Sequence, residues 1–167
     1  HLDMTIVTGS RWLAECARKS AILRNKRIEV IPSGVDIDIY RPLGKKQSRD
    51  ILNLDPNAQY ILFGAMSATS DPRKGFDYLK PALKRVAHRC HGDVKALVLG
   101  ASRPENPPNF GLPTTYIPRL HDDWSLALVY SAADVLIAPS TQDNLPFSVL
   151  EALCCGTPCV AFNIGGM

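Results

Sequence analysis

The chain has 167 residues, of which 46% are hydrophobic and 21% charged, and its formal net charge is +3. This composition is typical of a globular domain of ordinary size and excludes an intrinsically disordered chain. The charge is too small to argue for a nucleic-acid partner, and no apolar run approaches the roughly 18 residues needed to cross a bilayer.

The first 42 residues predict a small unit followed by a linker. The expected elements are a strand at Thr5–Thr8, a helix at Arg11–Lys19 capped by Ser10, and a strand at Ile28–Ile31. Residues 35–50 are polar and contain Pro42 and Gly44, which predicts an irregular stretch. We therefore place the start of the main domain at residue 43.

Strands and helices alternate in residues 43–167. The expected strands are Tyr60–Phe63, Lys95–Leu99, Tyr116–Ile117, Val135–Ala138 and Cys159–Phe162, and the expected helices are Asp77–Cys90, Trp124–Ser131 capped by Asp123, and Leu145–Cys155 capped by Asn144. This alternation predicts the α/β class, with a Rossmann-like, doubly wound parallel sheet. Because no helix follows the last strand to cover it, we expect a chain truncated at its C-terminus that self-associates through the uncovered strand.

Basic residues gather between positions 73 and 91. Lys80, Lys84, Arg85 and Arg89 fall on an expected helix and predict a solvated face. Arg73 and Lys74 differ because they lie in a loop before Gly75. In an open parallel sheet, ligands bind beyond the carboxyl ends of the strands, where this loop is expected.

The stretch from Asp143 to Gly166 contains two carboxylates around one helix start. Glu151 has no lysine or arginine at the i±3 and i±4 positions of its own helix, so it needs a partner from elsewhere or from a ligand. The amides at this helix start are suited to an anion. Together with the charges of Lys74 and Arg73, they predict a site for a phosphate-bearing ligand.

These motifs resemble those of a known family. The stretch DNLPFSVLEALCCGTPCVAFNIGG, residues 143–166, is similar to the nucleotide-sugar motif E-N-L-P-x-x-x-x-E-A-x-x-x-G-x-P-V-V-A of family-4 retaining glycosyltransferases, the glycosyl transferases group 1, which have the GT-B fold. Residues 30–42 (VIPSGVDIDIYRP) resemble the interdomain linker of that family, and residues 71–76 (DPRKGF) resemble its phosphate loop. Residues 131–140 (SAADVLIAPS) resemble a core strand and its approach. The resemblance implies that residues 1–42 are the end of an acceptor domain and a linker, and that residues 43–167 are an incomplete C-terminal, nucleotide-sugar-binding domain.

The resemblance also implies roles for individual residues. Lys74 is expected at the donor diphosphate, Glu151 at the ribose hydroxyls, Asp143 at the transferred sugar and Leu120 beside the base. Asp143 and Glu151 are the expected catalytic pair. The remaining expected donor-binding residues are Arg73, Asn144, Leu145 and Pro146.

The chain departs from the family pattern at some positions. Asp143 is one methylene shorter than the usual glutamate. The family often has a phosphate-binding arginine shortly after the strand that ends at Gly64, and residues 65–68 here are Ala-Met-Ser-Ala. We expect no metal and no cofactor, since the nucleotide-diphosphate sugar is the donor substrate.

The predicted function is therefore hexosyl transfer, with retention, to a glycan or lipid-linked acceptor in polysaccharide biosynthesis. The chain alone is expected to be inactive because the acceptor domain is missing. The alternatives are a nucleotide-sugar epimerase of the same fold and a non-catalytic nucleotide-sugar-binding domain. The five cysteines lack paired CxxC spacing, which predicts reduced thiols and a cytoplasmic protein, with peripheral contact at the inner face of the membrane for the full-length chain.

Overall fold

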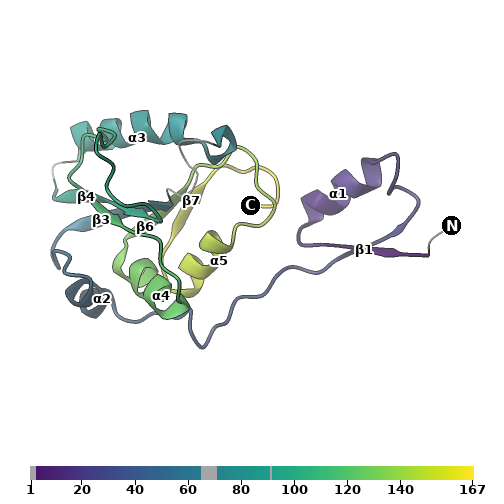
Figure 1. Ribbon diagram of the computed structural model, residues 1–167, viewed down its shortest axis with the longest axis horizontal. Helices are drawn as coiled ribbons and strands as arrows, with labels where there is room; N and C mark the ends of the chain where they lie inside the picture. The colour runs from purple at the N-terminus through teal and green to yellow at the C-terminus, as the bar shows by residue number, and fades with distance from the viewer. Residues whose placement is uncertain (1–2, 65–70, 91) are drawn as a thin grey trace.

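Two parallel sheets of unequal size organise the chain, which the computed structural model describes over residues 3–64, 71–90 and 92–167. In the small sheet, strand β1 (Thr5–Thr8) pairs with β2 (Arg27–Val30), and helix α1 (Arg11–Lys19) connects them. Ser10 caps α1 as predicted, since its Oγ accepts the Leu13 N–H at 3.2 Å. An extended segment joins this unit to the main body (Figure 1).

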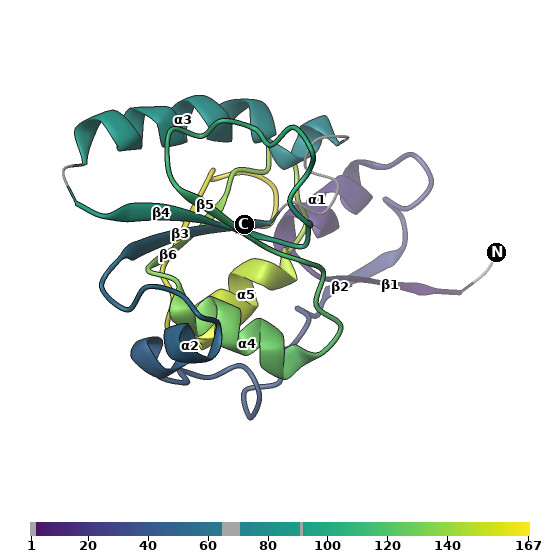
Figure 2. The same ribbon diagram turned by 60° about the vertical axis from the view of Figure 1, so that its left-hand side comes forward.

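The main body is a five-stranded sheet between two layers of helices. Its strands are β3 (Gln59–Gly64), β4 (Val94–Leu99), β5 (Thr114–Ile117), β6 (Val135–Ala138) and β7 (Cys159–Ala161), in the order β5-β4-β3-β6-β7. All pairs are parallel. Helix α3 (Phe76–Arg89) covers one face, and α4 (Asp123–Ala132) and α5 (Phe147–Cys154) cover the other (Figure 2). The predicted α/β class with a parallel sheet is confirmed.

Consecutive residues of β3 explain why both faces are covered. Leu62 is fully buried in the cluster on the side of α4 and α5, whereas Phe63 is 1% exposed in the cluster under α3. Side chains alternate along a strand, so an apolar strand buried on both sides needs helices on both. Each such side chain contributes about 1.5–3 kcal/mol of burial free energy.

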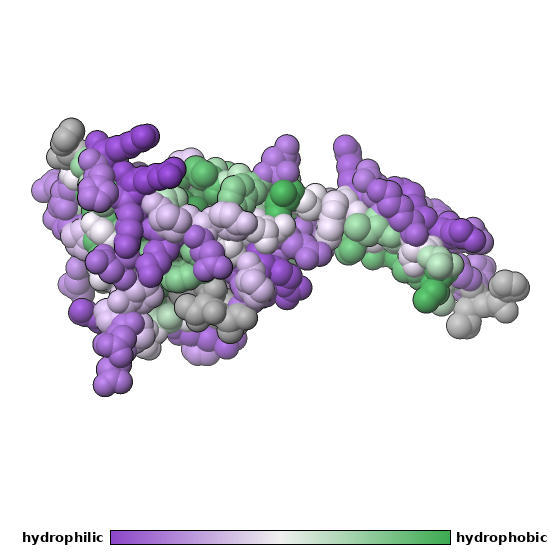
Figure 3. Space-filling model, turned by 90° about the horizontal axis from the view of Figure 1, so that it is seen from above, coloured by the Kyte–Doolittle hydropathy of each residue, from purple (hydrophilic) through white to green (hydrophobic). Residues whose placement is uncertain are grey.

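The solvent face of α3 is basic, as predicted. Lys80, Lys84, Arg85 and Arg89 are all exposed. Figure 3 looks down on this side of the molecule and shows hydrophilic side chains gathered over α3. Over the part of the chain that the structure describes, no helix is both long and apolar enough to span a membrane.

Two predicted helix starts are wrong. The motif helix begins at Phe147 rather than Leu145, because the ring of Pro146 keeps Leu145 out of helical conformation. Asn144 therefore does not cap it, and its Oδ1 instead accepts the Ser10 hydroxyl at 2.6 Å. Helix α4 is capped by Asp122, which accepts the Ser125 N–H at 2.8 Å, and not by Asp123.

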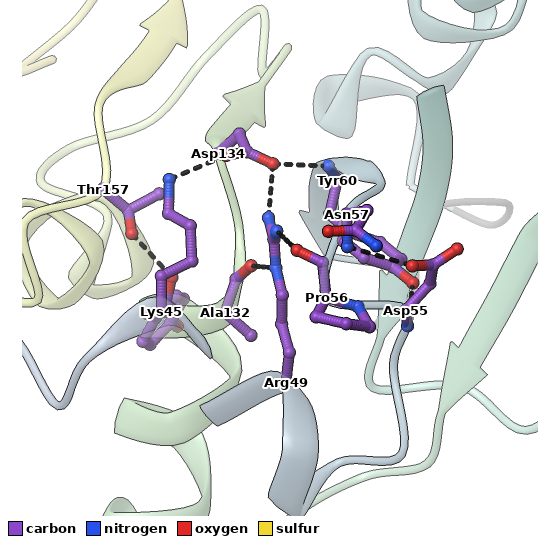
Figure 4. Close-up of polar contacts among 10 residues, drawn as sticks. Lys45, Arg49, Asp55, Pro56, Asn57, Tyr60, Ala132, Asp134 and Thr157 are labelled. Carbon is purple, nitrogen blue, oxygen red and sulfur yellow. Dashed lines mark hydrogen bonds and ion pairs between the residues drawn. The ribbon is translucent and has the colours of Figure 1, made fainter. Parts of the chain in front are cut away.

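The expectation of an irregular stretch over residues 35–50 is confirmed as far as residue 44 and is wrong beyond it, because helix α2 (Lys45–Ile51) begins there. Arg49 explains its stability. Its guanidinium donates to the carbonyl oxygens of Ala132 and Pro56 at 2.9 and 3.0 Å and to Asp134 at 2.6 Å, and lies 5.1 Å from the centre of the Tyr60 ring (Figure 4). These contacts, invisible to local sequence pattern, attach α2 to the sheet.

The carboxylate of Asp134 accepts hydrogen bonds from several donors. Lys45 Nζ donates to it at 2.7 Å, and so does the Tyr60 N–H at 2.7 Å (Figure 4). Burial alone would raise the pKa of Asp134, but the hydrogen bonds from Lys45 and Tyr60 and the charge of Arg49 lower it. The ionised carboxylate is thus favoured in the folded state.

We predict that Asp134→Asn lowers the free energy of unfolding by about 2 kcal/mol at pH 7, as expected for lost hydrogen bonds to a charged group. Because the folded pKa lies below the unfolded value of about 3.9, this stabilisation is present above that value and is lost as the pH falls through the folded pKa. Urea denaturation from pH 7 to pH 3 measures it. The control is Asp50→Asn, at an exposed carboxylate on α2. A difference from wild type that stays constant with pH would contradict the prediction.

Candidate functional site

A cavity of about 390 Å³ lies where the strand order reverses between β3 and β6. Its wall includes Gly64 at the end of β3, Gly100 after β4 and Ser140 after β6. The neighbouring connections leave from opposite faces of the sheet at such a point, so they separate and leave a crevice beyond the carboxyl ends of the strands. This is the place where the sequence predicts ligand binding.

The loop that carries Lys74 is held against the end of β6. Gly75 has a φ of +67°, and a Cβ atom there would meet the backbone oxygen of Pro139 inside van der Waals contact. The Thr141 N–H donates to the Arg73 carbonyl oxygen at 2.7 Å. Only glycine permits so close an approach, and the approach delivers Lys74 to the cavity wall.

Lys74 and Asp143 form an ion pair across this wall. Lys74 Nζ lies 3.0 Å from Asp143 Oδ2, and the side chains are 42% and 17% exposed. Asp143 is fixed from two further directions, because its Oδ1 accepts the Asn144 N–H at 2.9 Å and its carbonyl oxygen accepts the Gly166 N–H at 3.1 Å. The cation expected at a diphosphate and the carboxylate expected at a sugar are thus in direct contact.

The N-terminus of α5 forms another part of the wall. Pro146 and Ser148 line the cavity, and within the described part of the chain no side chain caps this helix. The first N–H groups of a helix have no acceptor within it, and the helix dipole makes this end positive. This end of α5 is therefore suited to an anion.

Glu151 lies one turn further along α5 and also lines the cavity. Its Oε2 accepts the Tyr130 hydroxyl at 2.7 Å. Burial raises the pKa of Glu151, the Tyr130 hydrogen bond lowers it, and the charge of Asp123 raises it, with an upward net shift. The partner that the sequence required from outside the helix is therefore a tyrosine.

The other predicted donor-binding residues lie in different places, one on the main cavity and others on a neighbouring hollow or on neither. Leu120 lines the main cavity. Arg73 lies elsewhere, because Asp71 accepts its Nε and Nη2 at 3.0 and 2.9 Å, and it lines a hollow of about 260 Å³ with Trp12 and Asn144. Leu145 is half-buried.

Sequence reasoning missed Arg119 and Tyr130, both of which line the main cavity. Arg119 follows β5, and a cation directly after a parallel strand was the available signal. A buried tyrosine requires a partner for its hydroxyl, but only the fold shows that the partner of Tyr130 is Glu151.

Residues 65–68, where the chain lacks the arginine that is frequent in the family, lie outside the described residues. Within the described ranges, no group of three or more His, Cys, Asp or Glu side chains is arranged to hold a metal ion.

The chain is similar to known glycosyltransferases in sequence. It matches the family described as glycosyl transferases group 1 over residues 58–167, which is more than half of its length. The D-inositol 3-phosphate glycosyltransferase of Segniliparus rotundus is 35% identical to it over 152 residues, which cover 85% of this chain and 33% of that protein. The chain thus spans about a third of the length of this curated relative.

Solved structures show the same fold. Sucrose-phosphate synthase from Thermosynechococcus elongatus superposes with a TM-score of 0.78 at 24% identity, over 97% of this chain and 41% of that one. HepE of Anabaena, in complex with UDP-glucose, superposes with a TM-score of 0.69 at 23% identity, over 97% of this chain and 45% of that one. Both likenesses indicate one half of a GT-B fold. With this fold and the match over residues 58–167, the chain belongs to the glycosyl transferases group 1 family.

Proposed function

We propose that this chain binds the nucleotide-diphosphate-sugar donor of a retaining glycosyltransferase. In the whole protein, the sugar is transferred to a glycan or lipid-linked acceptor on the cytoplasmic side of a membrane. The observation that carries the proposal is the cavity at the strand reversal, where Lys74, the start of α5 and Glu151 share one wall. Residues 43–167 supply this donor site, and residues 1–42 are the end of the acceptor domain and the linker.

The diphosphate occupies the positive part of the wall. Lys74 Nζ binds its oxygens after leaving Asp143, and the first N–H groups of α5 donate to it. Arg119 supplies a further cation on the cavity wall. When the bond to the sugar breaks, negative charge grows on the diphosphate, and donors already fixed in place stabilise that charge.

The remaining groups recognise the two ends of the donor. Glu151 accepts hydrogen bonds from the ribose hydroxyls, and Leu120 packs against the base. Asp143, released from Lys74, accepts a hydroxyl of the transferred sugar. Arg73, which Asp71 neutralises, contacts the donor only if that pair opens.

The first experiment is a thermal-shift panel of UDP-, GDP- and ADP-sugars. HepE was solved with UDP-glucose, which makes a UDP-sugar the first ligand to test. One base should raise the melting temperature well above the others, because a shaped pocket discriminates between bases. Lack of a shift with every nucleotide sugar would oppose the proposal.

We predict that Glu151→Gln preserves the fold and weakens the nucleotide sugar by about tenfold or more, the effect of losing about 1.5 kcal/mol from a charged hydrogen bond. Isothermal titration calorimetry measures the affinity. The control is Glu105→Gln, at an exposed glutamate in the connection after β4. Unchanged affinity in Glu151→Gln would mean that Glu151 is a structural carboxylate.

The Lys74–Asp143 pair gives a second prediction, which separates diphosphate binding from sugar binding. Lys74→Ala should weaken the sugar nucleotide and the bare nucleoside diphosphate alike, most strongly at low salt because Lys74 is partly exposed. Asp143→Ala should weaken only the sugar nucleotide. The Asp143→Ala variant should bind the bare nucleoside diphosphate more tightly than the wild type does, since no carboxylate then competes for Lys74.

Titration of both ligands into both variants gives four affinities. If Asp143 served only to order the start of α5, Asp143→Ala would lower stability by about 0.5–2 kcal/mol without selective loss of the sugar nucleotide. An equal loss for both ligands in Asp143→Ala would refute the assignment of Asp143 to the sugar.

A further inference from the structure

Tyr130 joins the two helices that lie under the cavity. It belongs to α4, and its hydroxyl donates to Glu151 Oε2 on α5 at 2.7 Å. The residue is 3% exposed, yet it lines the same cavity as Glu151. Among the described residues, no basic side chain forms an ion pair with Glu151. The tyrosine hydroxyl is thus the observed support of this carboxylate.

Tyr130 is itself held by contacts to its backbone and to its ring. The Thr157 hydroxyl donates to the Tyr130 carbonyl oxygen at 2.6 Å. The Tyr40 ring packs on the Tyr130 ring with centroids 6.3 Å apart, and the Tyr40 hydroxyl donates to Asp123 at 3.0 Å. Tyr40 therefore does not take part in the hydrogen bond to Glu151, and the direction of the Tyr130 hydroxyl is set by buried contacts.

We propose that Tyr130 is a positioning residue for donor recognition: it engages Glu151 Oε2 and so holds the carboxylate with Oε1 free for the ribose diol. This inference rests on the proposed function, in which Glu151 accepts the ribose hydroxyls. A carboxylate with one oxygen fixed loses less conformational freedom when a ligand binds the other. Tyr130 then sets the affinity for the ribose without touching it.

The same hydrogen bond affects the charge of Glu151. Burial and the charge of Asp123 raise the pKa of Glu151, and donation from Tyr130 opposes them. The other titratable groups near Glu151 are Tyr40 and Cys155. Burial raises the pKa of Tyr40, and it raises the pKa of Cys155 to about 11.

None of these neighbours supplies positive charge. The cations that line the same cavity are Lys74, which is paired with Asp143, and Arg119, and no ion pair with Glu151 is found for either among the described residues. Loss of the Tyr130 hydroxyl should therefore favour protonated Glu151 at a higher pH.

The experiment compares UDP with 2′,3′-dideoxy-UDP by calorimetry, because these ligands differ only in the ribose hydroxyls. In Tyr130→Phe, the affinity for UDP should fall by about fivefold or more, as expected for a lost hydrogen bond to a charged group, while that for the dideoxy ligand stays the same. The acid limb of the UDP affinity should move to higher pH. Tyr40→Phe is the matched control, with the same substitution on the adjacent ring.

Each outcome decides between structural and positioning roles. A Tyr130→Phe variant that retains the wild-type preference for UDP overturns the inference and leaves the proposed function intact. If the wild-type protein binds UDP no more tightly than the dideoxy ligand, then Glu151 does not bind the ribose hydroxyls, and this inference is refuted as well. Adding Tyr130→Phe to Glu151→Gln supplies a second measurement: no further loss supports positioning through Glu151, and an additive loss contradicts it.

Discussion

The reversal of strand order between β3 and β6 is the constraint on which the site depends. The connections after these strands leave toward opposite faces of the sheet, so space opens between them. Gly75 then closes part of that space, because a residue without a Cβ can lie against the backbone of Pro139. The same contact carries Lys74 to Asp143. Topology thus provides the cavity, and one glycine provides its charged wall.

Lys74 and Glu151, the charged side chains argued to bind the donor, each have a partner within the protein. Lys74 is neutralised by Asp143 at 3.0 Å, and a diphosphate would take over that cation. Glu151 is supported instead by the neutral Tyr130 hydroxyl, so it keeps its acceptor capacity without a cation that would attract the diphosphate. The two acids of the motif therefore have different partners, in agreement with different roles toward the two ends of a donor.

The sequence predicted what local pattern controls and missed what tertiary contacts control. Apolar strands separated by helices were enough to predict the parallel sheet, and the site was expected at its carboxyl edge. Helix α2 was missed because Arg49 stabilises it through contacts with distant backbone. The cap predicted at Asn144 does not form because Pro146 restricts Leu145, so α5 begins after the proline. Tyr130 was missed because its pairing with Glu151 joins two helices that become neighbours only in the fold.

Hydrogen–deuterium exchange, with and without a bound nucleotide sugar, tests the central claim most directly, because it maps the donor on the chain without a mutation. We predict increased protection in residues 71–76, in 118–121 and at the start of α5, residues 144–148. The solvent face of α3 should remain unchanged in the same experiment. Protection confined to other segments, in a protein shown to be saturated with ligand, would contradict a donor site at the strand reversal.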